Sequence, residues 1–481
     1  RQPRSTLFPY TTLFRSSNEP EVVDGRMYWN ISKLYDEILR GFELCFRKGH
    51  DDISSIGIDT WGVDYALIDR HGDTISKIYH YRDRRTDGIE KMIEMKIGLK
   101  DLYKRTGIQN IFFNTSFQLT AMTIEEPDVL AGSKYLLMIP DYLNYLLTGE
   151  ISSEYTVAST TQLLDPQTCT WDTELIRSLG IPESIFTRII YPGEYTGKLK
   201  KEITDALGIP YLPVVATASH DTSAAICAVP SDDDEYAYIS CGTWSIAGIT
   251  LENPIINDDT FRFGFSNEGS AEGKVNFLKN VMGLWILQEI RRIWLIDRDD
   301  LTYADMESMA ESGNAFEQFI DVEDDIFKNP EDMTIAVKEY CKRTGQKVPS
   351  NDSQLIRCVL ESLALKYRSV FEEIEKLTGK TINKIHIVGG GVKNILLCKL
   401  SANALRRHLI CGPSECTALG NAVIQFVANG AFASTAEGRT VISRSVSVDH
   451  YYPDQDEEIW EKAYIQYLEL FSQQRSMKCL H

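Results

Sequence analysis

The stretch "LPVVATASHDTSAAICAV", residues 212–229, joins an apolar segment to a run of small residues through a polar junction. Val214 and Val215 are typical of a buried strand, and the small residues that follow the junction are typical of a helix. The junction itself, residues 219–222, reads Ser-His-Asp-Thr. In α/β proteins, polar side chains at the carboxyl end of a strand point into the crevice where ligands bind. This stretch therefore predicts an α/β fold with a ligand site at the junction.

Asp221 admits two interpretations. Its carboxylate can accept a proton from a hydroxyl group and align that oxygen for attack on phosphorus, while His220 orients Asp221 or holds a substrate hydroxyl. Alternatively, Asp221 or Thr222 is an ordinary cap of the helix that follows. A serine hydrolase does not fit the His-Asp pair, because the sequence contains no G-x-S-x-G elbow.

Strands alternate with helices along the rest of the chain, which favours a layered α/β architecture. A chain of 481 residues is also too long for one core, so two large domains are expected. Alternating or apolar runs predict strands, and helical spacing predicts helices. The strands are expected within residues 53–73, 236–250 and 382–388, and the helices within 30–49, 90–150, 275–294, 353–377, 395–405 and 412–430.

Glycine turns interrupt this pattern where strands end. Gly242 and Thr243 stand between two strands, and the three glycines 389–391 stand between a buried strand and a helix. Such turns expose backbone N–H groups that can cradle a phosphate. A plain β-turn and tight strand–helix packing are the respective alternatives, and neither stretch is a P-loop.

A tryptophan next to a glycine marks a third turn. Trp61 and Gly62 lie in "IDTWGVD", residues 58–64, and a tryptophan at a crevice mouth commonly holds the apolar face of a sugar. Alternatively, Trp61 belongs to the core and Asp64 is a turn residue.

Composition limits the class of protein. The formal net charge of −19 repels phosphate backbones, so no nucleic-acid partner is expected. No apolar stretch approaches the roughly 20 residues that span a bilayer, so no membrane partner is expected either. The ten cysteines are scattered without a C-x-x-C pair, which makes a zinc site improbable and favours reduced thiols in the cytoplasm.

Eleven motifs resemble those of the FGGY family of carbohydrate kinases, in the order in which that family has them. The resemblance runs from about Asn18 to near Leu468 and is greatest to members that phosphorylate L-rhamnulose. The motifs are "GIDTWGVD", "YRDRRT", "MIPDYLNYLLTGE", "SEYTVASTTQLLD", "ASHDT", "CGTWS", "NEGSAEG", "LKNVMGLWILQE", "NPEDM", "HIVGGGVKN" and "GPSECTALGN".

The resemblance implies the two-domain, actin-like or ribonuclease-H-like ATPase fold. We therefore expect an N-terminal sugar-binding domain over residues 17–230 and a C-terminal nucleotide-binding domain over residues 231–470. Residues 1–16 are expected to be a foreign or disordered tail, and residues 471–481 a second tail.

The resemblance further implies ATP-dependent phosphorylation of L-rhamnulose at its 1-hydroxyl in rhamnose metabolism, with Mg²⁺. Its partners are then the small-molecule ketose and ATP. By the family's pattern Asp221 is the catalytic base, the sugar contacts are Gly62, His220, Asp221, Thr222 and Asn280, and the ATP contacts are Thr243, Gln288 and Gly390; no metal ligand is assigned. The rival hypotheses are a kinase of another ketose, fuculose or xylulose, and a non-catalytic sugar-binding protein.

The chain departs from the family's pattern at its start. The opening "RQPRSTLFPYTTLFRS" carries three arginines and no acid, and it stands where the family has an aspartate- and glycine-rich hairpin that grips the ATP phosphates. We therefore expect an incomplete N-terminal sheet and reduced kinase activity.

Four cysteines also bear on the resemblance. Cys241 and Cys416 replace a usual serine and a frequent alanine. Cys341 and Cys358 match positions that form a disulfide in a relative, and such a bridge is not expected to persist in cytosol.

Overall fold

The structure is a computed structural model that describes residues 14–50, 52–232 and 236–478. The chain divides into two compact units. Unit 1 comprises Arg1–Asp232, Thr250–Leu278 and Cys416–Ser445, and unit 2 comprises Asp233–Ile249, Lys279–Glu415 and Val446–His481. The predicted domain limits stay a prediction, since two later segments group with the N-terminal half of the chain.

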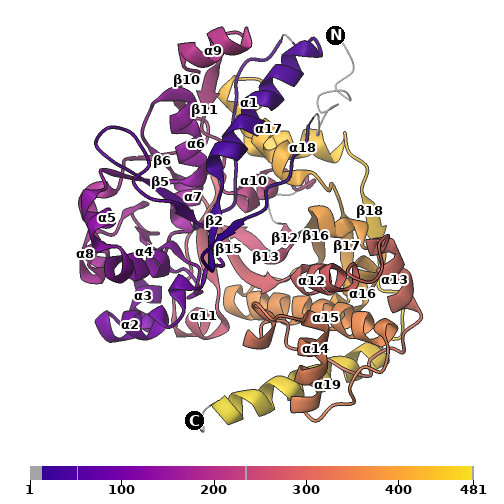
Figure 1. Cartoon of the computed structure of the whole chain (residues 1–481). Coiled ribbons are helices and arrows are strands. Elements are labelled where there is room, and N and C mark those ends of the chain that lie inside the picture. The colour runs from indigo at the N-terminus through magenta and orange to yellow at the C-terminus, as the bar shows by residue number, and fades with distance from the viewer. Residues whose placement is uncertain (1–13, 51, 233–235, 479–481) are drawn as a thin grey trace. The chain divides into compact units, whose positions relative to one another are not determined.

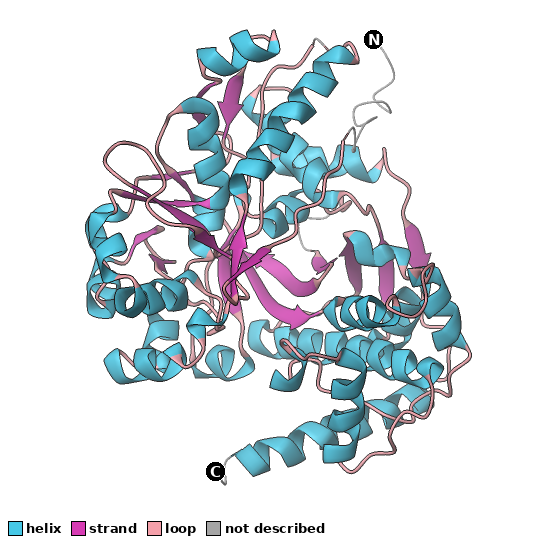
Figure 2. Cartoon of the chain, viewed as in Figure 1, coloured by secondary structure: helices cyan, strands magenta, loops and turns pink. Residues whose placement is uncertain are grey.

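Unit 1 combines helices with short strands (Figures 1 and 2). Its strands are β1 (Glu21–Val23), β2 (Arg26–Trp29), β3 (Tyr65–Ile68), β4 (Ile78–Tyr79), β5 (Tyr135–Met138), β6 (Ser153–Glu154), β7 (Leu164–Asp165), β8 (Thr170–Trp171), β9 (Ile189–Ile190), β10 (Tyr195–Lys198), β11 (Pro213–Val215) and β14 (Ser266–Gly269). Its helices are α1 (Ile31–Arg47), α2 (Ile89–Lys96), α3 (Leu99–Thr106), α4 (Thr115–Glu125), α5 (Pro127–Gly132), α6 (Ile139–Thr148), α7 (Tyr155–Ser159), α8 (Thr173–Leu179), α9 (Lys201–Leu207), α10 (Asp221–Cys227), α11 (Asp258–Phe263), α17 (Cys416–Ala428) and α18 (Thr435–Ser443).

Unit 2 contains the longest described helix and a mixed sheet. Its strands are β12 (Ala237–Cys241), β16 (Lys384–Val388), β17 (His408–Cys411) and β18 (Asp449–Tyr451), and β13 (Trp244–Leu251) and β15 (Val275–Met282) run across the division between the units. Its helices are α12 (Trp285–Trp294), α13 (Tyr303–Glu311), α14 (Met333–Arg343), α15 (Asp352–Thr378), α16 (Ile395–Leu405) and α19 (Glu457–Lys478).

The core of unit 1 follows from the pleat of β3 and β5, which pair antiparallel from Tyr65 opposite Met138 to Ile68 opposite Tyr135. Successive side chains of a strand point to opposite faces, so a strand that is covered on both faces feeds two cores. Tyr65 and Leu67 lie in one apolar cluster, whereas Ala66 and Ile68 lie in the other. This double burial explains the uninterrupted apolar run "YALI".

Helix α1 covers the second of these clusters. The side chains predicted to share one helix face, Leu34, Ile38 and Phe42 among them, pack against that cluster. Asn30 begins the helix, because its side-chain oxygen accepts the hydrogen bond of the Lys33 N–H at 2.9 Å. The helix predicted within residues 30–49 is confirmed, with Asn30 as its cap.

The mixed sheet has the strand order β14-β15-β13-β12-β16-β17-β18, and all of its strands except β14 belong wholly or partly to unit 2. Strands β12, β16 and β17 run parallel, with Tyr238 opposite His386 and His386 opposite Ile410, while β13 and β18 are antiparallel to their neighbours. Figure 1 shows α12 to α16 on one side of these strands. Because β12 and β16 are parallel neighbours, the turns that follow them lie at the same edge of the sheet. These are the two glycine turns predicted to hold phosphate.

The structure corrects the helix predicted over residues 275–294. Residues up to Met282 form strand β15, and only Trp285–Trp294 form a helix. The apolar spacing is compatible with either element in its first half, and pairing with β14 decides for the strand. Conversely, α13 occupies an acidic stretch for which no helix was expected; it begins with a capping box between Thr302 and Asp305.

The ends of the chain lie partly outside the described residues. The tail predicted over residues 1–16 stays a prediction, since residues 1–13 belong to that part. Phe14 contacts α1, with the Arg40 guanidinium 5.3 Å from its ring centre. At the other end, α19 continues to Lys478, so residues 471–478 of the second predicted tail are helical. Cys341 and Cys358 are buried free thiols.

Candidate active site

The Ser-His-Asp junction connects β11 to α10, as the sequence predicts, and a second segment fixes its backbone. Thr60 N–H donates to the Ser219 carbonyl at 2.9 Å, and Asp221 N–H donates to the Thr60 carbonyl at 2.8 Å. Thr60 and His220 thus form a parallel bridge. The turns "DTWG" and "SHDT" therefore lie side by side at the carboxyl ends of two segments, where α/β proteins place ligand sites.

Asp221 begins α10, but its carboxylate does not cap the helix. His220 occupies the N-cap position and makes no side-chain capping hydrogen bond. The Asp221 side chain is 46% exposed and receives a hydrogen bond from Thr222 Oγ1 at 3.3 Å. Desolvation by the surrounding protein raises its pKa, while the charge of His220 and the bonds from Thr222 oppose the rise. A half-exposed carboxylate with an elevated pKa suits a general base.

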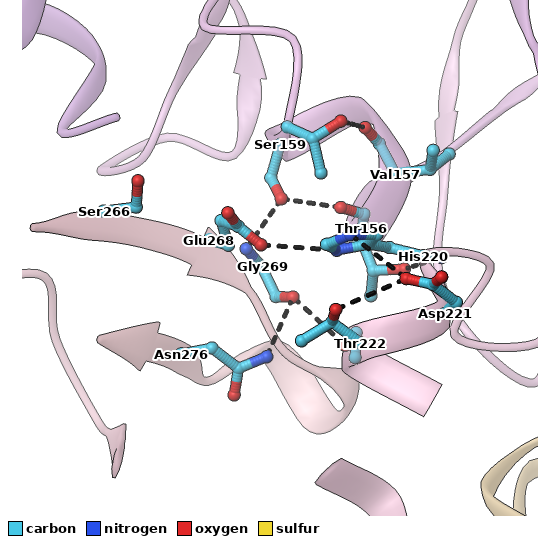
Figure 3. A network of polar contacts seen from close by, with 12 residues as sticks. Thr156, Val157, Ser159, His220, Asp221, Thr222, Ser266, Glu268, Gly269 and Asn276 are labelled. Atoms are coloured by element: carbon cyan, nitrogen blue, oxygen red, sulfur yellow. Dashed lines mark hydrogen bonds and ion pairs between the residues drawn. The ribbon is translucent and has the colours of Figure 1, made fainter. Parts of the chain in front are cut away.

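The His220 imidazole lies between two carboxylates (Figure 3). Its Nε2 is 3.5 Å from Asp221 Oδ1, and its Nδ1 is 3.3 Å from Glu268 Oε2 on β14. Burial lowers the pKa of His220, but the hydrogen bond and the charge of Glu268 outweigh this effect and leave the pKa above its ordinary value. Glu268 was not among the predicted site residues, although it lies in the motif "NEGSAEG", residues 267–273.

A buried glutamate holds the backbone of the junction. Glu154 accepts hydrogen bonds from Ser219 N–H at 3.1 Å, Thr156 N–H at 2.9 Å and Thr156 Oγ1 at 2.6 Å. Thr156 Oγ1 in turn accepts from His220 N–H at 3.2 Å. Burial raises the pKa of Glu154 to about 7. This residue positions the turn from the opposite side to Thr60.

Gly62 lies in close contact with Thr160, the residue that follows α7. A Cβ atom at this position would lie 2.9 Å from Thr160 Oγ1, and the same oxygen accepts the Val63 N–H at 3.1 Å. Val63 has a φ of 64°, in the left-handed region that side chains rarely adopt. Only glycine fits position 62 without displacing Thr160.

Asp64 is completely buried, so it is not a surface turn residue. Its carboxylate accepts hydrogen bonds from Trp29 Nε1 at 2.6 Å, Trp61 Nε1 at 3.0 Å, Tyr81 N–H at 3.1 Å and Gln118 Nε2 at 2.9 Å. Burial raises its pKa to about 6 despite these bonds. The rings of Trp29 and Trp61 pack with their centres 4.2 Å apart. Asp64, which directly follows Gly62 and Val63, thereby sets the orientation of both indole rings.

Asp59 is a second carboxylate that interacts electrostatically with Asp221. Burial raises the pKa of Asp59 to about 7, and the Asp221 charge adds to the rise. Asn421 of α17 donates to Asp59 Oδ2 at 2.6 Å and to the Gly57 carbonyl at 3.0 Å. From the same helix, Thr417 Oγ1 donates to the Asp221 carbonyl at 3.3 Å. Helix α17 therefore supports both Asp59 and Asp221.

In unit 2 the structure places the two glycine turns against each other. A Cβ at Gly389 would lie 2.9 Å from the Cys241 carbonyl oxygen, and one at Gly391 would lie 2.2 Å from Cys241 Sγ. A Cβ at Gly390 would meet nothing within 4 Å. Thr243 Oγ1 donates to Gln288 Oε1 at 3.1 Å. The predicted ATP contacts Thr243 and Gln288 are thus direct neighbours, and Gly390 has an unobstructed Cα.

Asn280 is the remaining residue of the predicted sugar site, and no residues were predicted to bind a metal ion. Asn280 is half-buried on β15 and belongs to unit 2, whereas Gly62, His220, Asp221 and Thr222 belong to unit 1. No group of three or more histidine, cysteine, aspartate or glutamate residues that could hold a metal ion occurs among the described residues. Within the same part of the chain, no helix is long and apolar enough to cross a bilayer.

Comparisons with known proteins identify the class as a two-domain α/β sugar kinase. The N-terminal domain model of the FGGY family of carbohydrate kinases matches residues 15–227, and the C-terminal domain model matches residues 237–429. This chain belongs to the FGGY family of carbohydrate kinases. The predicted fold class and the prediction of a carbohydrate kinase are confirmed.

Curated relatives match over most of the chain. The rhamnulokinase of Bacteroides thetaiotaomicron is 40% identical over 445 residues, which cover 92% of this chain and 90% of the relative. The rhamnulokinase of Oceanobacillus iheyensis is 39% identical over 423 residues, 88% of each chain.

Solved structures share the fold at low identity. The gluconate kinase of Lactobacillus acidophilus superposes with a TM-score of 0.78 at 17% identity, covering 95% of this chain and 91% of its own. Plasmodium falciparum glycerol kinase with ADP superposes with a TM-score of 0.75 at 16% identity, covering 95% and 92%.

Proposed function

We propose that this chain transfers the terminal phosphate of ATP to the 1-hydroxyl of L-rhamnulose, as a step of rhamnose catabolism. The observation that carries this proposal is the identity of 37–40% to rhamnulokinases of several bacteria over 88–95% of this chain. The half-exposed carboxylate of Asp221 supports it, because a protein that only binds a sugar requires no base at this position.

The chemistry assigned to Asp221 is general-base catalysis. As the 1-hydroxyl oxygen forms a bond to the terminal phosphorus, its proton passes to the Asp221 carboxylate, the bond from phosphorus to the bridging oxygen of ATP breaks, and ADP leaves. The transition state of phosphoryl transfer is loose, so positioning and charge neutralisation supply most of the rate. Gly62, His220, Thr222 and Asn280 are proposed to hold the ketose.

The nucleotide is assigned to the glycine turns of unit 2. Thr243, Gln288 and Gly390 are proposed ATP contacts, with backbone N–H groups of both turns directed to phosphate oxygens. The unobstructed Cα of Gly390 supports a close approach by the ligand. Mg²⁺ is proposed to accompany ATP, because this ion is usually held by substrate phosphates together with one or two carboxylates. A cytoplasmic location stays a prediction.

A coupled assay of ADP release tests the sugar. The protein is assayed with L-rhamnulose, L-fuculose and D-xylulose, and the highest kcat/KM is expected for L-rhamnulose. A higher kcat/KM for either other ketose would refute the proposed substrate. Sugar binding in calorimetry without any binding of ATP would instead favour the non-catalytic alternative.

A further inference from the structure

Glu268 is a buried carboxylate that the proposed mechanism does not use. It lies on β14 opposite Asn276 and is 5% exposed. The strand is held against α7, because Gly269 N–H donates to Ser159 Oγ at 2.7 Å and a Cβ at Gly269 would lie 2.6 Å from the Tyr155 ring. Buried glutamates are rare unless they are paired. The fixed strand therefore holds the Glu268 carboxylate at one place, and its partner should explain its burial.

That partner is the imidazole of His220. Glu268 Oε2 is 3.3 Å from His220 Nδ1, and the side chains are 7% and 10% exposed. Within the described part of the chain, neither atom has a conventional hydrogen-bond partner beyond this ion pair. The opposite ring nitrogen is 3.5 Å from Asp221 Oδ1. Glu268, His220 and Asp221 therefore form a line in which the imidazole joins a buried carboxylate to an exposed one (Figure 3).

We propose that Glu268 is a positioning residue that acts through His220 to hold the Asp221 carboxylate ionised and oriented toward the sugar hydroxyl. This inference rests on the proposed role of Asp221 as the base of a ketose kinase. Glu268 itself touches neither substrate.

The proton inventory of the imidazole explains how Glu268 reaches the base. A neutral imidazole has one N–H and donates to one carboxylate, whereas an imidazolium donates to both. The negative charge of Glu268 favours the imidazolium, and the imidazolium stabilises the ionised form of Asp221. Without Glu268, His220 loses its proton more readily, and Asp221 then loses the neighbouring positive charge that lowers its pKa. The charge of Glu268 also acts on Asp221 directly and raises its pKa, but this effect is smaller than that of the His220 charge.

Other charged groups near the line are acidic. Glu154 acts on His220 from the start of α7, and Asp59 acts on Asp221 from the neighbouring segment. Both raise the proton affinity of the group that they face. They do not replace Glu268, because Glu154 accepts hydrogen bonds from the N–H groups of Ser219 and Thr156, and Asp59 accepts a hydrogen bond from Asn421.

The substitution Glu268→Gln tests the inference in the complete chain. The constants kcat and KM for L-rhamnulose are measured from about pH 5 to about pH 9, the range around the ordinary pKa of histidine. The acidic limb of the profile should move to higher pH and the basic limb to lower pH, so the profile narrows. At the optimum kcat should fall about 10-fold, less than the ~10²- to 10⁴-fold loss expected when a general base is removed. KM for the sugar should change little.

A second measurement needs no turnover. The imidazole signals of His220, assigned with the variant His220→Asn, are titrated by NMR in the wild type and in Glu268→Gln. The midpoint for His220 should fall by about 1 pH unit or more, since an opposite charge at this distance shifts a pKa by roughly that amount.

Glu272→Gln is the matched control. Glu272 lies in the turn between β14 and β15, and its carboxylate accepts hydrogen bonds from Thr435 N–H at 2.9 Å and Thr435 Oγ1 at 2.6 Å. Within the described residues, its carboxylate is bonded to Thr435 and not to His220. Both limbs of the pH profile of kcat should therefore stay at their wild-type positions. Glu268→Asp keeps the charge and should retain most of kcat, which also covers the case that Glu268→Gln does not fold.

Two results would overturn the inference. One is an unchanged His220 midpoint together with unchanged limbs in Glu268→Gln, which leaves only a structural role for the glutamate. The other is an equal loss of kcat in Glu268→Asp and Glu268→Gln with no change in the His220 titration. If the wild type turned over no ketose, the proposed function would fail instead, and the NMR titration would still decide whether Glu268 controls His220.

Discussion

The carboxylate of Asp221 is available for chemistry because other groups fix the turn around it. Thr60 and Glu154 bind the backbone of the junction from two sides, and the side chain itself makes no helix cap. The groups that stabilise its anion are the N–H and the hydroxyl of Thr222 and the imidazole of His220. A capping role, the alternative that the sequence left open, would have directed the carboxylate to the backbone N–H groups of Ser223 or Ala224, two and three residues further on.

The substitution Asp221→Asn should reduce kcat by about 10²- to 10⁴-fold, because the amide has the same shape but cannot accept the hydroxyl proton. Since the protein raises the pKa of Asp221, loss of the charge should not lower the free energy of unfolding. ADP release checks the expected loss of kcat, and denaturant unfolding checks the free energy of unfolding. Asp205→Asn on the exposed face of α9 is the control, and an Asp221→Asn variant with more than about a tenth of wild-type kcat would rule out the base.

At this scale the sequence reveals only those site residues that are neighbours in the chain. His220, Asp221 and Thr222 are adjacent, so one motif predicts all three. Glu268 reaches His220 from a strand that follows later in the chain, and no local pattern marks that approach. Asp64 likewise fits the pattern of a turn residue until the structure shows the four donors around it.

Among the elements, α10 and α17 pack unusually closely, and this contact helps to fix the position of Asp221 and Asp59. A Cβ atom at Gly420 of α17 would lie 1.7 Å from the Ala224 carbonyl oxygen of α10. The neighbouring Cys416 Sγ donates to the Ala225 carbonyl at 3.2 Å. Small residues on both helices permit the approach, and α17 then brings Asn421 to Asp59. The position of Asp221 at the start of α10 depends on this packing.

The substitution Gly420→Ala should destabilise the protein, because the added methyl group separates α17 from α10. We expect a loss of about 1–3 kcal/mol in the free energy of unfolding, the usual cost of overpacking, together with a lower kcat. Gly41→Ala in α1 is the matched control: its Cβ would only touch the Phe14 ring at 3.6 Å. That variant should gain up to about 1 kcal/mol from helix propensity. Denaturant unfolding measures both, and an equal effect of the two substitutions would refute the packing argument.

Elements with a single strong period were predictable, and ambiguous ones were not. The amphipathic spacing over 30–49 and 353–377 predicts α1 and α15, which lie at Ile31–Arg47 and Asp352–Thr378. The run 275–294 has apolar residues that suit a strand as well as a helix, and the helix prediction was wrong for the first half of this run. Hydrogen bonds to β14 decide that case, and they come from another segment.

For the whole molecule, buried carboxylates set the pH dependence of stability. Burial raises the pKa to about 7 for Asp59, about 6 for Asp64 and about 7 for Glu154. The folded state therefore binds more protons than the unfolded state between about pH 4 and about pH 7, and its stability falls as the pH rises through that range. The raised pKa of His220 acts in the same direction, whereas His80, whose pKa burial lowers to about 4, opposes it.

The midpoint of chemical unfolding should therefore be higher at about pH 6 than at about pH 8. It should fall again in strong acid, where carboxylates with lowered pKa values, such as Asp172 beside Arg105, lose their charge. Unfolding followed by tryptophan fluorescence over this range measures the trend. The substitution Asp64→Asn should reduce the difference between the unfolding midpoints at the two pH values. A protein whose free energy of unfolding increases steadily up to pH 8 would contradict this expectation.

The sequence by itself determined the α/β class, the glycine turns and the kinase family, and it marked Asp221 with its neighbours as the candidate site, because these depend on period, composition and adjacent residues. Only the tertiary structure decided that Glu268 meets His220, that Asp64 joins two tryptophans and that α17 supports both aspartates of the site. Each of those contacts joins segments far apart in the chain, and burial makes it count, since a buried polar group must find its partner wherever the fold supplies one.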